Sequence, residues 1–309
     1  MRALATDVAA ASTRVVDAPV PVPAPGQILI EVRVSAVNEM DVQVRAGGWA
    51  RQVSAFRKAG PVLTGFEFAG VARSDGARIA AGQRIIGYSP VLDGPRTHAQ
   101  FAVIGERHAE PIPDDLSDED AAALVVMGLT AIEVLERIRP LQPDQRALVI
   151  GAAGGVGIYS VQLAASQGAV VSAVAGGDSA AWLAGQGAAD VRPREGPYRA
   201  GDRFDLVLDA AGKSSFAQAA AHLARGGTYV STNPTGDLGG FVRAALSGKR
   251  AGWLMMLRTD PARLRRLIAL WRAGALKPAI DSVYALEDAD AAFDRFAARG
   301  KRGRVLLKL

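Results

Sequence analysis

The sequence predicts an α/β fold in which a doubly wound parallel sheet is joined to a second, β-rich part. Three observations predict it. Residues 1–110 carry short apolar stretches punctuated by glycine, as β-rich domains do. From about residue 115, apolar runs alternate with helical stretches, which is typical of βαβ units in a parallel sheet. The end of the chain, in "AIDSVYAL" and "GRVLLKL", returns to strand character.

Length and composition fit a globular protein with two domains. The chain has 309 residues, of which 49% are hydrophobic and 22% charged. No apolar run approaches the roughly 20 residues that a membrane span needs. The first residues lack the apolar core of a secretory signal, because Asp7, Arg14 and Asp17 interrupt them. We therefore expect no membrane span and a cytoplasmic protein.

Cysteine, histidine and the net charge exclude several classes of site. The chain has no cysteine, so it forms neither a disulfide nor a thiolate zinc site. His98, His108 and His222 show no catalytic or metal-binding spacing, and we expect structural roles for them. The net charge of +5 comes from basic residues interleaved with acids, which disfavours nucleic acid as a partner. The densest basic stretch, "RTDPARLRRLIALWR", has the spacing of an amphipathic helix.

Strands and connections of the β-rich part follow from alternation and punctuation. "QILIEVRVSAVN" (27–38) alternates apolar and polar residues, the period of a half-buried strand. "FEFAGVA" and "QRIIGY" predict further short strands, and the proline-rich 18–26 predicts an extended connection.

The second part begins with a helix, for which Ser117 is the expected N-cap and acidic residues fill the first turn. The expected strands that follow are 146–150, 169–174, 204–209 and 227–232, separated by stretches long enough for crossover helices.

A glycine-rich loop lies between the first of these strands and the next helix. In "VIGAAGGVG", Gly154, Gly155 and Gly157 follow strand 146–150 and open a helix predicted over 155–167. Glycines at such a turn let the backbone approach a pyrophosphate, and the helix N-terminus offers it free N–H groups. Ala152 replaces the first glycine of the usual G-x-G-x-x-G pattern. The strand–loop–helix–strand context predicts a dinucleotide-binding site.

Residues after the second strand favour one nicotinamide cofactor over the other. An acid at the end of this strand binds the ribose hydroxyls of NAD. This strand ends "AVAGG", with no acid before Asp178, and Arg192 and Arg194 follow at the third strand. Arginine suits a 2′-phosphate. The pattern favours NADPH over NADH, although Asp178 argues against it.

Eight stretches in order, "VNEMDVQVRAGGW", "LTGFEFAGVA", "GQRIIGY", "THAQFAVI", "VMGLTAIEVL", "VIGAAGGVG", "GGTYVSTN" and "RGKRGRVLL", resemble the medium-chain dehydrogenase/reductase superfamily. The likeness spans essentially the whole chain and is to the zinc-independent, quinone oxidoreductase-like branch. It implies a GroES-like catalytic domain over 1–117 and 268–309 and a Rossmann domain over 118–267. It also implies an active site in the cleft between them and a homodimer, which we expect to form through the sheet edge at 251–256.

The same resemblance implies the roles of individual residues. Asn38 and Asp41 match its N-x-x-D element and are expected at the catalytic centre. Ser179 and Arg194 replace the lysine and tyrosine that bind the 2′-phosphate in many members. Trp49 and Tyr88 are the expected substrate contacts. The expected cofactor contacts are Thr130, Ala153, Gly154, Gly155, Val156, Gly157, Gly176, Ser179, Arg194, Asn233 and Pro234.

Departures from the family pattern narrow the chemistry. Phe66, in "GFE", stands where zinc-dependent relatives have a ligand histidine, so no zinc is expected. A quinone or an activated C=C bond accepts hydride without a metal, whereas ordinary alcohol oxidation relies on one. Trp49 stands where many relatives carry a tyrosine and favours a flat substrate, with the final proton coming from water.

We therefore expect an NADPH-dependent reductase of quinones or α,β-unsaturated carbonyls. Two alternatives stay open: an enoyl or enone reductase of a biosynthetic pathway, and a non-catalytic nucleotide-binding redox sensor or nucleic-acid-associated protein.

Overall fold

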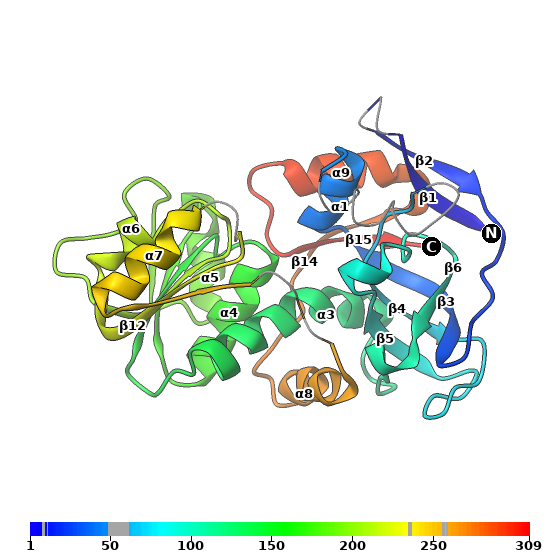
Figure 1. The fold of residues 1–309 in the computed structure, drawn as a ribbon, viewed down its shortest axis with the longest axis horizontal. Coiled ribbons are helices and arrows are strands. Elements are labelled where there is room, and N and C mark those ends of the chain that lie inside the picture. The colour runs from blue at the N-terminus through cyan, green and yellow to red at the C-terminus, as the bar shows by residue number, and fades with distance from the viewer. Residues whose placement is uncertain (8–9, 11, 49–61, 234–236, 255–256, 258) are drawn as a thin grey trace. The chain divides into compact units, whose positions relative to one another are not determined.

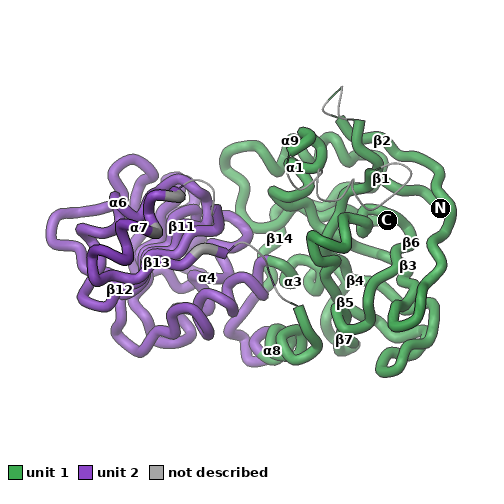
Figure 2. Tube along the Cα trace, in the orientation of Figure 1, with its two compact units in different colours: residues 1–126, 258–269, 278–309 green, residues 127–257, 270–277 purple. Residues whose placement is uncertain are grey.

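The fold consists of two compact units (Figures 1 and 2). The computed structural model describes residues 1–7, 10, 12–48, 62–233, 237–254, 257 and 259–309. Unit 1 comprises Met1–Val126, Arg258–Ala269 and Pro278–Leu309, and unit 2 comprises Met127–Leu257 and Leu270–Lys277.

The first boundary between the units lies inside helix α3 (Asp118–Ile132), at Val126, whereas the predicted domain boundary is Ser117. The first turn of α3 is fastened to unit 1, since Asp118 pairs with Arg84 and Glu119 with Lys308. Ser117 Oγ accepts a hydrogen bond from the Asp120 N–H at 3.1 Å, which confirms it as the N-cap.

Unit 1 is built on a seven-stranded sheet with the order β14-β15-β3-β4-β5-β7, in which β6 also pairs with β3. Its strands are β3 (Gln27–Ala36), β4 (Glu67–Ala72), β5 (Arg84–Tyr88), β6 (Phe101–Gly105), β7 (Ala109–Pro111), β14 (Ile280–Ala285) and β15 (Arg304–Lys308). Only β14 and β15 pair in parallel. Alternate residues of β3, including Ile28, Ile30 and Val32, pack with Phe68 in the core, as the alternation predicts.

Shorter elements surround this sheet. The hairpin β1 (Arg2–Asp7) and β2 (Ser12–Asp17) forms a separate two-stranded sheet. Helices α1 (Glu39–Arg45) and α9 (Ala289–Ala297) and the 3₁₀ turns η1 (Val91–Asp93), η2 (Glu106–His108) and η6 (Leu286–Asp288) complete the unit. Helix α9 packs on β14 and β15.

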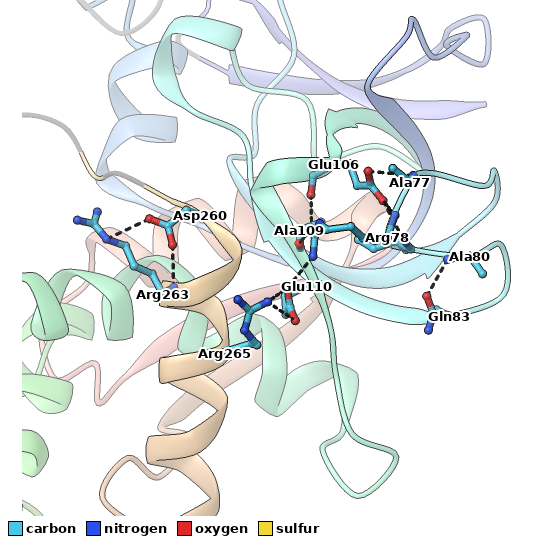
Figure 3. Close-up of polar contacts among 11 residues, drawn as sticks. Ala77, Arg78, Ala80, Gln83, Glu106, Ala109, Glu110, Asp260, Arg263 and Arg265 are labelled. Carbon is cyan, nitrogen blue, oxygen red and sulfur yellow. Dashed lines mark hydrogen bonds and ion pairs between the residues drawn. The ribbon is translucent and has the colours of Figure 1, made fainter.

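The arginine-rich stretch forms helix α8 (Pro261–Arg272), and a polar network fastens its first turns to unit 1 (Figure 3). Glu110, on β7, accepts from Arg265 Nη1 at 3.2 Å and from Arg78 Nη1 at 3.1 Å. Arg78 Nη2 also donates to the carbonyls of Glu106 and Ala109, each at 3.0 Å. The basic face of this helix therefore carries an ion pair to the β-rich unit.

Unit 2 contains a six-stranded, wholly parallel sheet with the order β10-β9-β8-β11-β12-β13. Its strands are β8 (Arg146–Ile150), β9 (Val170–Val174), β10 (Asp190–Arg192), β11 (Phe204–Asp209), β12 (Leu223–Ser231) and β13 (Arg250–Trp253). Successive strands run outward from β8 first on one side and then on the other, which is the order of a dinucleotide-binding sheet. This order confirms the predicted doubly wound fold.

Helix α3 and its π-helical continuation η3 (Glu133–Ile138) lead into β8. The crossover helices between the strands are α4 (Gly155–Ser166), η4 with α5 (Gly177–Ser179 and Ala180–Gly185), α6 (Phe216–Ala220) and α7 (Leu238–Ser247). Across the described ranges, no helix combines the length and the apolar content needed to cross a membrane.

Candidate functional site

The glycine loop lies at the carboxyl edge of the parallel sheet. Strand β8 ends at Ile150, and α4 begins at Gly155 with Gly154 as its N-cap. Because β9 and β11 flank β8, this is the point at which the strand order reverses. Ligands of open α/β sheets bind outside the carboxyl ends of the strands at such a point. The first backbone N–H groups of α4 and its helix dipole face a prospective anion there.

Two positions of this loop require glycine. Gly151 adopts φ +80°, a conformation that L side chains rarely adopt. A Cβ at Gly157 would lie 2.2 Å from the Gly151 carbonyl oxygen and 2.7 Å from Ala152 Cα, so no other residue fits. The start of α4 therefore packs directly against the preceding turn, with Ala152 and Ala153 buried beneath it.

A charged corner follows β9. A Cβ at Gly176 would lie 2.8 Å from Asp178 Oδ1 and 3.6 Å from Arg194 Nη2, so both side chains lie beside this glycine, and both are exposed. Ser179 is buried, and its N–H donates to the Gly176 carbonyl at 3.0 Å. Ser179 thus helps to form the turn, while Arg194 offers an exposed guanidinium next to a carboxylate.

Arg192, two residues before Arg194, forms ion pairs with two aspartates of the same unit. Its side chain is 3% exposed and donates to both oxygens of Asp202, at 2.6 and 3.2 Å. Its Nε donates to Asp190 Oδ2 at 2.8 Å. Of the two arginines that the sequence offers for phosphate recognition, Arg192 is therefore engaged by the buried Asp202 and the half-buried Asp190.

The loop after β11 lies beside the glycine loop, and the loop after β12 lies beside the loop after β11. A Cβ at Gly151 would lie 2.8 Å from Ala211 Cβ, and one at Gly212 would lie 2.9 Å from Asn233 Cβ. Asn233 is exposed, whereas Thr130, on α3, is largely buried. Pro234 lies outside the described residues.

A buried polar cluster occupies unit 1, and it consists of Asn38, Asp41, Glu67 and Arg304. Each of these residues is at most 2% exposed. Arg304 Nη2 donates to Asn38 Oδ1 at 2.9 Å and also to Glu67 Oε1. Glu67 Oε2 accepts from the Val126 N–H at 2.6 Å. A single guanidinium thus joins β15, β4 and the start of α1.

Asp41 closes the cluster at the N-terminus of α1. Its Oδ2 accepts from the Asn38 N–H at 2.8 Å, and its Oδ1 accepts from the Gly65 N–H at 2.6 Å. Burial raises the pKa of Asp41 to about 7, although both backbone donors and Arg304 oppose the rise. Asn38 Nδ2 donates to the Ala36 carbonyl at 3.1 Å. This geometry gives Asn38 and Asp41 well-defined structural partners.

Of the two expected substrate contacts, the structure describes Tyr88. Tyr88, at the end of β5, is 1% exposed and lies in the core, and burial raises the pKa of its hydroxyl. Trp49 lies outside the described residues.

Two groups that sequence reasoning did not place in the site are Arg304 and Asp209. Arg304 lies in the stretch "RGKRGRVLL", whose pattern predicts a strand and gives no role to this arginine. Asp209 ends strand β11, and a carboxylate at the end of a parallel strand is the signal that was available.

The chain matches two family models and is similar to several known proteins. The family model described as "Alcohol dehydrogenase GroES-like domain" matches residues 24–114, and that described as "Zinc-binding dehydrogenase" matches residues 186–307. The quinone oxidoreductase of Mus musculus is 28% identical over 313 residues, covering 95% of this chain and 92% of the relative. The spectinabilin polyketide synthase system protein NorB of Streptomyces orinoci is 31% identical over 305 residues, covering 93% of this chain but 13% of its own length.

Solved structures share the fold over the whole chain. The quinone oxidoreductase from Coxiella burnetii superposes with a TM-score of 0.90 at 24% identity, covering 100% of this chain and 99% of the other. A thermostable alcohol dehydrogenase from Pyrobaculum aerophilum gives a TM-score of 0.83 at 26% identity, with the same coverage.

Proposed function

Because the chain belongs to the medium-chain dehydrogenase/reductase superfamily, in its quinone oxidoreductase-like branch, we propose that it is an NADPH-dependent reductase that transfers hydride to a quinone or an activated α,β-unsaturated carbonyl. Membership makes the protein an oxidoreductase with a nicotinamide cofactor and a small-molecule substrate. The choice of NADPH, the acceptor class and independence of zinc are the proposal.

The observation that carries the proposal is the glycine loop at the reversal point of the sheet. The N–H groups of Gly155, Val156 and Gly157 open α4 toward an anion, and the absence of side chains at Gly154 and Gly155 leaves room for a pyrophosphate. Ala153 belongs to the same turn. When bound, the nicotinamide supplies the hydride, and the chain supplies binding and orientation.

The preference for NADPH rests on Arg194. Its guanidinium lies beside Gly176, just after β9, where a dinucleotide fold places the adenosine ribose. The neighbouring Asp178 would repel a 2′-phosphate, but a cationic fork of donors beside it favours one. Ser179 contributes to this corner through the turn that it helps to form.

Independence of zinc is supported by the donor set of the chain. There is no cysteine, and Phe66, in the position of a ligand histidine, is buried in the core. His98 Nδ1 lies 2.8 Å from Thr64 Oγ1, and His108 Nδ1 lies 2.8 Å from Thr259 Oγ1. Among the described residues, no group of three histidines or acids lies close enough together to hold a metal ion. These residues do not fit a zinc site, so no step is assigned to a metal.

The chain's own groups act by positioning. In the proposal, Asn38 and Asp41 fix the start of α1 at the catalytic centre, and Thr130 and Asn233 contact the cofactor. Trp49 stacks on a flat substrate. Tyr88 is buried in the core of unit 1, so in the proposal it supports the site through packing. The final proton comes from water, since a hydroquinone or enolate oxygen needs no dedicated acid.

The test measures binding first and turnover second. Titration of the purified protein with NADPH and with NADH, followed by nicotinamide fluorescence, gives both affinities. NADPH oxidation is then measured against a panel of quinones and enones, with and without a zinc chelator. We expect tighter binding of NADPH and chelator-insensitive oxidation with at least one acceptor. Absence of turnover with every acceptor contradicts the proposal and favours a non-catalytic, nucleotide-binding redox sensor or nucleic-acid-associated protein.

A second candidate function is an enoyl or enone reductase of a biosynthetic pathway. The 31% identity to a polyketide synthase system protein over 93% of this chain favours it. The acceptor panel separates the two functions: turnover confined to α,β-unsaturated thioesters or enones, with quinones inert, supports the second.

The homodimer and the cytoplasmic location remain predictions. Among the described strands, β13 is an edge strand of the parallel sheet of unit 2, near the predicted interface at 251–256. Sedimentation of the purified protein gives its oligomeric state, and a monomer at micromolar concentration contradicts the dimer.

A further inference from the structure

Asp209 joins three loops that meet at the carboxyl edge of the parallel sheet of unit 2. It is the last residue of β11, and in register it pairs with Ile150, the last residue of β8, and with Ser231, the last residue of β12. The Ala210 N–H donates to the Ile150 carbonyl at 3.0 Å, and the Thr232 N–H donates to the Asp209 carbonyl at 3.1 Å. Three parallel strands therefore end at one level, with Asp209 in the middle.

The carboxylate of Asp209 is buried, and the turn that it holds is on the surface. Its Oδ1 accepts from the N–H groups of Ala211 at 3.2 Å and Lys213 at 3.1 Å. Its Oδ2 accepts from the Ser214 N–H at 2.8 Å. The side chains of Ala211 and Lys213 are exposed, whereas Asp209 has no exposed surface. One buried side chain thus fixes the backbone of an exposed turn.

Two tyrosines, Tyr198 and Tyr229, form hydrogen bonds to the same turn. Tyr229 Oη donates to the Ser214 carbonyl at 2.9 Å and to Asp209 Oδ2 at 3.4 Å. Tyr198 Oη lies 2.8 Å from Ser214 Oγ. Burial raises the pKa of Tyr229, and the charge of Asp209 adds to the rise, so the phenol stays a donor.

The turn is pressed against both neighbouring loops. Gly151, in the glycine loop, has no room for a Cβ because Ala211 Cβ would lie 2.8 Å away. Gly212 adopts φ +62°, and a Cβ there would lie 2.9 Å from Asn233 Cβ. A shift of the turn would therefore be felt at the glycine loop and at Asn233 together.

The position of the turn assigns it to one half of the cofactor. The adenosine ribose of a dinucleotide lies at the end of the second strand, here β9, and the pyrophosphate lies at the glycine loop. The turn at 210–214 lies on the opposite side of β8 from β9. We propose that Asp209 is a positioning residue of the dinucleotide site, whose carboxylate holds the 210–214 turn where the nicotinamide-bearing half binds. The inference rests on the proposed function, since it requires that a dinucleotide binds at this edge.

Asp209→Asn tests the assignment, because an amide has one acceptor oxygen where three backbone donors need two. Asp205→Asn is the matched control. Asp205 lies near the other end of the same strand and accepts from the Arg146 N–H at 3.0 Å and from Gln145 Nε2 at 3.1 Å. Calorimetry measures the binding of NADPH and of 2′,5′-ADP, which carries the adenosine and its 2′-phosphate but no nicotinamide. If the wild type prefers NADH, the probes are NADH and ADP-ribose.

We expect Asp209→Asn to weaken binding of the whole dinucleotide about tenfold and to leave the affinity for the adenosine fragment within about twofold. Asp205→Asn leaves both affinities unchanged. Tyr229→Phe, which removes one brace and keeps the three backbone bonds, weakens dinucleotide binding in the same direction but less. In the ligand-free protein, the amide protons of Ala211, Lys213 and Ser214 exchange faster in Asp209→Asn than in Asp205→Asn.

Four results overturn the inference. Asp209→Asn binds the dinucleotide as tightly as the wild type, or loses the fragment equally, or Asp205→Asn shows the same selective loss, or the amides of the turn exchange no faster in Asp209→Asn. A wild type that binds neither dinucleotide refutes the proposed function itself, and the inference falls with it. The amide exchange separates the two failures, because it tests the anchoring of the turn without any ligand.

Discussion

Arg304 Nη2 donates a hydrogen bond to Asn38 Oδ1 at 2.9 Å and so joins the last strand of the chain to the start of α1. The same nitrogen serves Glu67, and all three side chains are enclosed in unit 1. Burial raises the pKa of Glu67, and the guanidinium opposes the rise. The positive charge of Arg304 therefore offsets the cost of burying the carboxyl groups of Glu67 and Asp41.

Removing that charge should destabilise the protein strongly. We expect Arg304→Met to lower the free energy of unfolding by about 3–5 kcal/mol, because Glu67 and Asp41 lose their only described cationic partner in the cluster. Chemical denaturation measures the change. Arg2→Met is the control, since Arg2 pairs with Glu287 on the surface. An equal, small loss in both variants would contradict a central role for Arg304.

Asp41 should make stability fall as the pH rises. Its pKa is about 7 in the folded protein against 3.8 in the reference state, so the folded protein binds the extra proton between these values. Stability from this group is full near pH 4 and is lost toward pH 7, by at most about 1.4 kcal/mol per pH unit. Asp41→Asn should lose one backbone hydrogen bond and flatten this part of the profile. Denaturation of the wild type and of Asp41→Asn at intervals from pH 4.5 to 7.5 measures the two stability profiles. Parallel profiles would show that Asp41 does not cause the pH dependence.

His98 should make stability fall as the pH is lowered, which is opposite to the effect of Asp41. Burial lowers its pKa from 6.5 to about 4, so the unfolded chain binds more protons between these values. The stability it contributes is present above pH 6.5 and is lost as the pH falls toward 4. His98→Gln should remove that loss. The comparison uses the same denaturation series, and an unchanged acid limb would show that His98 titrates as it does in the unfolded chain.

Substitutions of Arg192 and Arg194 should have different effects: the first should lower stability, and the second should weaken cofactor binding. Arg192→Met leaves the buried Asp202 without its partner and should cost about 3 kcal/mol of unfolding free energy. Arg194→Met should leave stability nearly unchanged and weaken NADPH binding about tenfold, with little effect on NADH. Each variant is the control of the other. Equal effects of Arg194→Met on the two cofactors would dismiss it as the phosphate-binding residue.

Gly157→Ala should damage the glycine loop. Its Cβ would lie 2.2 Å from a backbone oxygen, so the loop or α4 has to move. We expect a lower melting temperature and loss of measurable dinucleotide binding. Gly185→Ala, in α5, meets nothing within 4 Å and should be neutral or stabilising by up to about 1 kcal/mol. Retained binding in Gly157→Ala would show that the cofactor does not need this turn.

Local patterns account for what the sequence predicts well. The predicted strands 146–150 and 204–209 have the observed bounds, and the helix predicted over 155–167 is observed as Gly155–Ser166. Each depends on a few neighbouring residues: an apolar run, a glycine turn, a cap. The strand order follows from right-handed crossovers between such units.

Partners far apart in the sequence account for what it does not predict. The predicted strand at the end of the chain gives no sign that Arg304 is buried, because its partners Glu67 and Asn38 lie on β4 and at the start of α1. Arg192 and Arg194 are alike in sequence, and the ion pairs of Arg192 with Asp202 and Asp190 distinguish them. The contribution of Asp209 is similarly hidden, because it acts through the backbone N–H groups of the residues that follow it.

The pairing of β15 with β3 has a consequence for synthesis on the ribosome. Unit 2 is encoded between segments of unit 1, and the sheet of unit 1 lacks β14 and β15 until the segment after unit 2 has emerged. Asp41 and Glu67 precede unit 2 in the sequence, and their guanidinium partner, Arg304, follows it. Domains tend to fold in the order of their synthesis. Unit 2 is therefore translated before the sheet of unit 1 is complete, and Asp41 and Glu67 acquire their buried partner only after it.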